Sequence, residues 1–154
     1  MAAPIAAADT ANFADSSSDA KPAYNIERVK VNHGRRIIAK ASLETIRKDR
    51  GSLSVYFDTR GGDPGPEYAG HGGLAKGSDY LGFKVEDWKG NESQVLDCSI
   101  RMGVDYGKDT ARYSVARKCF NRPDRVRVAV RASTKPGNTD WAPKVHRFYD
   151  WVRH

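Results

Sequence analysis

The chain has 154 residues, of which 39% are hydrophobic and 29% charged, and its formal net charge is +7. This length suits one domain, and the apolar runs are too short for a membrane span. The excess of Lys and Arg favours anionic partners without choosing among them, and we expect the protein to be a monomer.

The first 24 residues form a segment of low complexity, made mostly of Ala, Ser and Asp, with Phe13 isolated among them. Such a segment buries too little apolar area to offset the entropy lost on ordering. We therefore predict a disordered tail over residues 1–24 and a folded domain over residues 25–154. The tail lacks the apolar region of a signal peptide, so we expect that a signal peptide was removed near Ala6–Ala8 and that Met1 replaced it.

Apolar and polar residues alternate through most of residues 25–154, which is typical of strands with one buried face. The side chains predicted to point inward are, in chain order, Val29, Val31, Ile37, Ala39, Ala41, Leu43, Leu53, Val55, Phe57, Leu81, Phe83, Val85, Cys98, Ile100, Met102, Val104, Ala111, Tyr113, Val115, Val126, Val128, Val130 and Ala132. Residues 43–49 are predicted to form one helical turn, and residues 144–151 a last strand. With no longer amphipathic helix, the pattern predicts an all-β fold. We expect an antiparallel β-sandwich of about eight strands, jelly-roll or immunoglobulin-like.

The chain contains two cysteines, Cys98 and Cys119, and we predict that they form one disulfide. Neither has a histidine close in sequence that would make it a reactive thiol. A structural disulfide is typical of extracellular proteins, so we expect the protein to be secreted.

Residues 60–78 are predicted to form a long polar loop between two strands, and loops of this length are often functional. The candidate ligand-binding residues in or beside it are Asp58, Asp63, Glu67, Tyr68, His71, Asp79 and Tyr80, with Trp141 from a later loop. Because Ca²⁺ takes oxygen ligands from flexible backbone, Asp58, Asp63 and Asp79 are the candidate metal ligands. No other cofactor is expected. The alternative is an ordinary Gly/Pro connection whose Asp residues cap its turns.

A basic sheet face is also predicted. Arg125, Arg127 and Arg131 alternate with inward valines, and Arg101 and Arg112 hold equivalent outward positions on strands expected to be neighbours. Arginines on such a face could hold phosphate, sulfate or carboxylate groups, and the alternative is a solvated face that keeps the protein soluble. Since the strand 125–132 carries no aromatic residue for stacking bases, nucleic acid is not an expected partner.

Several motifs, R-V-K-V-N-H-G, V-Y-F-D-T, G-P-E-Y, G-S-D-Y, V-R-V-A-V-R-A-S and D-W-A-P, resemble those of small uncharacterised secreted proteins of high-GC Gram-positive bacteria. More distantly, Val55–Asp58 and Asp79-Tyr80 resemble DOMON and family-9 carbohydrate-binding β-sandwiches. That resemblance implies binding of a sugar or haem, in some members with Ca²⁺. No Met and His pair for haem can be assigned.

These observations favour a secreted, non-catalytic binding module for a carbohydrate or an anionic cell-surface polymer, which would use residues 58–80 and the basic face. One alternative is a protein-interaction or inhibitor domain that uses the same loop. A second is a hydrolase that uses a carboxylate pair such as Asp58 and Glu67. We do not expect an enzyme, because the chain has no nucleophile elbow, P-loop or zinc-protease motif.

Overall fold

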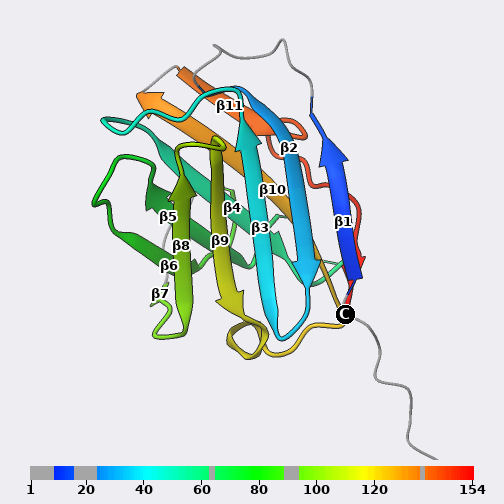
Figure 1. Ribbon diagram of the computed structural model, residues 1–154. Coiled ribbons are helices and arrows are strands. Elements are labelled where there is room, and N and C mark those ends of the chain that lie inside the picture. Colours follow the sequence, from blue (N-terminus) through cyan, green and yellow to red (C-terminus); the bar gives the residue numbers. More distant parts are fainter. Residues whose placement is uncertain (1–8, 16–23, 63–64, 89–93, 136–137) are drawn as a thin grey trace, which may run out of the picture.

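The computed structural model describes residues 9–15, 24–62, 65–88, 94–135 and 138–154. Two antiparallel sheets lie face to face, as Figure 1 shows. Sheet A, the front layer of that view, has the order β1-β2-β3-β9-β8, and sheet B has the order β11-β10-β4-β5-β6-β7, with β12 also paired to β10. The predicted all-β sandwich is confirmed.

The described residues form twelve strands rather than the predicted eight or so. Their bounds in sheet A are β1 Asp9–Ala14, β2 Ile26–His33, β3 Arg36–Leu43, β9 Thr110–Ala116 and β8 Ile100–Asp105. In sheet B they are β11 Asn138–Ala142, β10 Arg125–Lys135, β4 Ser52–Asp58, β5 Tyr68–Gly73, β6 Tyr80–Lys84 and β7 Gln94–Val95, with β12 at Val152–Arg153. A short 3-10 helix, η2, covers Arg117–Phe120.

The core lies between the sheets and is built from the predicted alternation. Val126, Val128 and Val130 of β10 are 0% exposed, and Tyr113 of β9 lies opposite them in the same cluster. Burial of such side chains contributes roughly 1.5–3 kcal/mol each, so this alternation dominates the choice of fold. The predicted inward sets of β2, β3, β4, β9 and β10 are confirmed.

The predicted loop over residues 60–78 is wrong in its middle, because β5 runs from Tyr68 to Gly73 and pairs with both β4 and β6. Its glycines make it look like a loop, yet they are required by packing. A Cβ on Gly70 would overlap the Tyr113 ring, and one on Gly72 would overlap the Met102 sulfur. The large inward side chains of sheet A thus take the place of side chains that β5 lacks.

The predicted inward set of β6 is also wrong. Leu81 is 49% exposed, and Phe83 and Val85 belong to a second apolar cluster on the outer face of sheet B. The inward position is taken by Gly82, where a Cβ would come within 2.5 Å of Ile100. As in β5, side chains of sheet A fill this part of the core. The positions of β6 that were predicted to point inward therefore point outward.

Part of the predicted disordered tail is a strand. Asp9–Ala14 form β1, which pairs with β2 along six residues, and Phe13 stacks on Tyr149 with ring centroids 4.5 Å apart. This polar segment is ordered by hydrogen bonds to the edge of an existing sheet and by burial of one aromatic ring. The rest of the predicted tail, apart from Asp15 and Tyr24, lies outside the described residues.

Two smaller predictions are wrong. Residues 43–49 form no helical turn, because the backbone N–H of Ile46 donates to the Asp109 carboxylate at 2.8 Å and holds the segment open. Residues 144–151 form no strand, because β11 and β12, which precede and follow them in the chain, already pair with β10. Between these pairings one hydrogen bond, from the Tyr149 N–H to the Val128 carbonyl at 2.9 Å, joins the segment to β10.

Candidate functional site

The structure places the described members of the predicted ligand-binding set in four different parts of the fold. Asp58 and Glu67 come together near the end of β4, while His71 and Trp141 lie on the outer face of sheet B. Tyr68 points into the core, where its ring stacks on Phe120 at 4.1 Å. Of the remaining candidates, Asp79 and Tyr80 are exposed at the start of β6, and Asp63 lies outside the described residues.

The two candidate calcium ligands that the structure describes, Asp58 and Asp79, do not converge. β4, β5 and β6 run antiparallel in turn, so Asp58 at the end of β4 and Asp79 just before β6 lie at opposite ends of the sheet. At about 3.3 Å per residue, the six residues of β5 separate them by roughly 20 Å. Within the part of the chain that the structure describes, no group of three or more His, Cys, Asp or Glu side chains could hold a metal ion.

Asp58 forms a buried ion pair with Arg127. Its carboxylate is 0% exposed, and its Oδ2 accepts a hydrogen bond from Nε of Arg127 at 2.7 Å while Nη2 lies 2.6 Å away. The backbone N–H of Arg60 donates to Oδ1 at 2.9 Å. Residues on adjacent strands β4 and β10 supply this pair, because Asp58 and Arg127 stand directly opposite in register.

Glu67 lies beside this pair and is 8% exposed. Its Oε1 accepts hydrogen bonds from the backbone N–H and the hydroxyl of Thr59, at 3.1 and 3.0 Å. Its Oε2 is buried and has no hydrogen-bond partner among the described residues. Burial, and then the negative charge of Asp58, raise the pKa of Glu67 to about 7. This carboxyl is therefore partly protonated at neutral pH.

We expect Glu67→Gln to stabilise the protein at pH 8 and to have little effect at pH 5. Since the folded state raises this pKa, the protonated form stabilises the fold below about pH 4.5, and that stability is lost as the pH rises through about 7. The side chain of glutamine is neutral at every pH, so the variant does not lose this stability as the pH rises. The free energy of unfolding, measured in urea, should rise by about 2 kcal/mol at pH 8. Glu86→Gln, at an exposed position, is the control, and equal effects of Glu67→Gln at both pH values would contradict the assignment.

The outer face of sheet B carries a surface of aromatic and arginine side chains, which we call the aromatic–arginine face. Its members are Tyr56, Trp88, Trp141, His146, Phe148 and Trp151, with Arg125, Arg127 and Arg131 of β10. Arg125 stacks on Trp151 at 4.1 Å, and Arg131 lies 5.7 Å from the Trp141 ring centroid. Trp88, Trp141 and Trp151 stay partly exposed. Aromatic rings from other segments therefore lie among the arginines of β10, although that strand carries none within residues 125–132.

One row of this face runs across four strands. The register places Trp141 of β11 next to Arg131 of β10, then Ser54 of β4, then His71 of β5. The Ser54 hydroxyl and Nδ1 of His71 are hydrogen-bonded at 2.8 Å. Burial, and then the charge of Arg131, lower the pKa of His71. The buried Nε of Arg131 has no hydrogen-bond partner among the described residues. The row thus combines a flat ring, a cation and neutral hydrogen-bonding groups.

The predicted single basic face is wrong. Arg101 lies on β8 and Arg112 on β9, and both strands belong to sheet A, whereas Arg125, Arg127 and Arg131 lie on β10 of sheet B. Since outward side chains of two stacked sheets point away from each other, the arginines form two faces on opposite sides of the sandwich. The alternation along each strand was right, but alternation does not say which sheet a strand joins.

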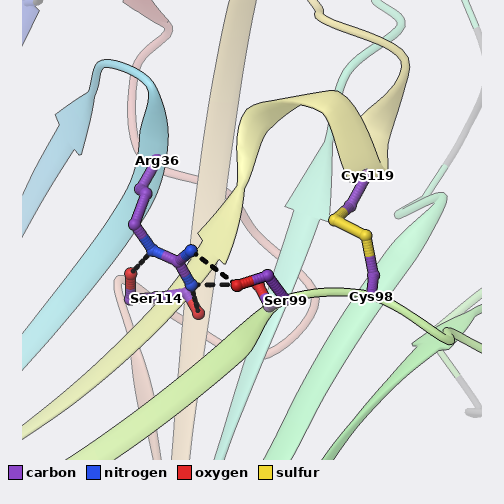
Figure 2. Close-up of a disulfide and its surroundings, with 5 residues drawn as sticks. All are labelled: Arg36, Cys98, Ser99, Ser114 and Cys119. Atoms are coloured by element: carbon purple, nitrogen blue, oxygen red, sulfur yellow. Dashed lines mark hydrogen bonds between the residues drawn. A yellow bond between two sulfur atoms is a disulfide. The ribbon is translucent and has the colours of Figure 1, made fainter.

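The predicted disulfide between Cys98 and Cys119 is confirmed, and it joins η2 to the segment before β8. Figure 2 shows Arg36 near it, held between Ser99 and Ser114 by hydrogen bonds of 2.6–2.9 Å. All of these bonds go to neutral oxygens. Burial lowers the pKa of Arg36, and the charges of Arg101 and Arg112 lower it further. Beside this arrangement lies an open cleft of about 520 Å³, whose lining includes Arg35, Arg117, Lys118 and Arg122.

Sequence reasoning missed Ser54, Tyr56, Trp88, Phe148 and Trp151 as site residues. One signal could have found Tyr56: it is a large aromatic residue on the outward parity of β4, between the inward Val55 and Phe57. Such a position suggests that the outer face of a strand is also covered. Trp88, Phe148 and Trp151 lie far apart in sequence, and only the fold brings them together.

The fold and the site together define a disulfide-bonded β-sandwich. No helix in the described ranges has the length and apolar character that crossing a membrane requires. No known family model matches the chain, and no curated protein is significantly similar to it.

Proposed function

We propose that the chain is a secreted, non-catalytic binding module for a carbohydrate that carries acidic groups, and that it binds this ligand on the aromatic–arginine face. The observation that carries the proposal is the row from Trp141 through Arg131 and Ser54 to His71. Aromatic rings stack on the apolar faces of sugars, and neutral polar groups hydrogen-bond to hydroxyls. The Arg131 guanidinium, which lies 5.7 Å from the Trp141 ring centroid, suits a carboxylate or sulfate on the same sugar.

Two arguments favour binding over catalysis. Asp58 has no exposed surface, and its charge is already compensated by Arg127, so a substrate could not reach it as the site is arranged. Glu67 is 8% exposed, and its Oε1 already accepts two hydrogen bonds from Thr59. The confirmed disulfide supports the proposed secretion, since such bonds persist in oxidising compartments. The resemblance to carbohydrate-binding sandwiches stays a prediction.

We expect Trp141→Ala to weaken binding of an acidic oligosaccharide at least tenfold, because the ring is the flat surface on which the sugar stacks. A glycan array of neutral and acidic oligosaccharides, followed by calorimetry on the best ligand, provides the measurement. Tyr80→Ala removes a second exposed aromatic residue from the far end of β6 and should leave binding unchanged.

Arg131→Gln separates the two parts of the interaction, because it keeps the Trp141 platform and removes the charge. Binding of acidic ligands should fall while binding of neutral ones is kept. If no glycan binds and a single protein is captured instead, the proposal fails and the protein-interaction alternative replaces it.

A further inference from the structure

Three cations stand side by side on the outer face of sheet A, and we call them the cation ladder. The register of β2, β3 and β9 places Lys30 opposite Lys40, and Lys40 opposite Arg112. Directly opposed residues of antiparallel strands point to the same side, with Cβ atoms about 4.5–5.5 Å apart. Lys30 and Arg112 are exposed and Lys40 is partly exposed, so all three reach solvent.

Two further positions around the ladder add positive charge. Arg28 precedes Lys30 by two residues on β2, and Arg101 lies on β8 opposite Ser114. The acidic residues lie toward the ends of the strands: Glu27 is exposed on β2 next to Arg28, and Oδ1 of Asp105 accepts hydrogen bonds from the backbone N–H groups of Gly107 and Lys108 at 3.0 Å. Within the described part of the chain, none of the three ladder residues forms an ion pair.

Like charges opposed across strands destabilise a sheet, so the fold carries a cost for this arrangement. The repulsion lowers the stability of the free protein, and a bound anion would replace it with attraction. Such an arrangement is typical of a binding surface.

The shape of this face suits a narrow chain. Thr10, Asn32 and Ile38 complete a shallow groove of about 330 Å³ along the ladder. The outward positions of sheet A that the register defines on β1, β2, β3, β9 and β8 carry no aromatic residue. Without rings to stack on, the face can recognise charge but not bases or sugar planes.

We propose that the cation ladder binds a linear polyanion through its phosphate or sulfate groups. This inference goes beyond the proposed function, because the ladder lies on the opposite sheet from the aromatic–arginine face and does not depend on it. Each cation would pair with one oxyanion and release one counter-ion, so binding should weaken steeply as salt rises.

Lys40→Gln provides the test, because Lys40 is the central member of the ladder. Calorimetry with linear polyphosphate, and with a sulfated oligosaccharide of equal charge, should show affinity about fivefold lower than for the unmodified protein. The slope of log affinity against log salt concentration should become shallower by about one, because one fewer counter-ion is released on binding. In the absence of probe and at low salt, the same variant should melt at a higher temperature, since the repulsion is relieved.

Lys76→Gln is the matched control, because it removes the same charge from an exposed loop on sheet B. It should change neither the affinity nor the melting temperature, and Trp141→Ala should leave polyanion binding intact. Tighter binding of polyphosphate than of the sulfated probe would identify phosphate as the group recognised, and the reverse order sulfate. The proposal is overturned if neither probe binds, if Lys76→Gln weakens binding equally, or if duplex DNA of equal charge binds more tightly than both.

Discussion

Arg127→Met is expected to lower the free energy of unfolding by about 3 kcal/mol at neutral pH. The substitution leaves the apolar stem of the side chain and removes the guanidinium that lies 2.6 Å from Asp58. Asp58 is 0% exposed, so its carboxylate would stay buried without a counter-charge beside Glu67. Urea unfolding at pH 7 measures the loss.

The double variant Asp58→Asn/Arg127→Met distinguishes the ion pair from simple packing. With both charges gone, most of the lost stability should return, because no uncompensated charge is left in the sheet. Arg147→Met, at an exposed position, controls for the substitution itself and should change stability by less than about 0.5 kcal/mol. A double variant no more stable than Arg127→Met alone would show that the arginine acts through packing on Phe148 and Trp151.

Removal of the disulfide is expected to have a similarly large effect. Cys98 and Cys119 stand 21 positions apart, and release of a loop of this size costs about 3 kcal/mol by the chain-entropy estimate. The thermal midpoint of Cys98→Ala/Cys119→Ala should therefore fall by several degrees. Reduction of the unmodified protein with a thiol should produce the same shift, and the thiol should not affect the double variant. An unchanged midpoint in both experiments would mean that η2 is held in place without the disulfide.

The two sheets could be predicted from sequence where the two-residue period is strong. Val126, Val128 and Val130 alternate with polar or small residues, and burial of one face leaves a single consistent register. β5 could not be found in the same way, because two of its three inward positions are Gly70 and Gly72. The side chains that fill that part of the core belong to Tyr113 and Met102, far away in the chain.

The candidate site could be predicted only in part, for a related reason. His71, Trp141 and Arg131 were all candidates, yet the single row that joins them depends on the pairing of β11, β10, β4 and β5. Asp58 and Glu67 were named as a pair only in the hydrolase alternative, and neither their separation nor their burial was predicted. Only Arg112 of the cation ladder was a candidate, because the three members come from three strands, and Lys30 and Lys40 alone look like ordinary exposed residues.

The strand β1 has a practical consequence for any shortened version of the protein. It covers one edge of sheet A, and Phe13 covers the ring of Tyr149. Removal of the residues up to and including Ala14, on the view that this polar segment is dispensable, would leave the N–H and C=O groups of β2 without partners. Open strand edges of this kind recruit strands from other molecules. A shortened chain would therefore self-associate, although its core and both faces were intact.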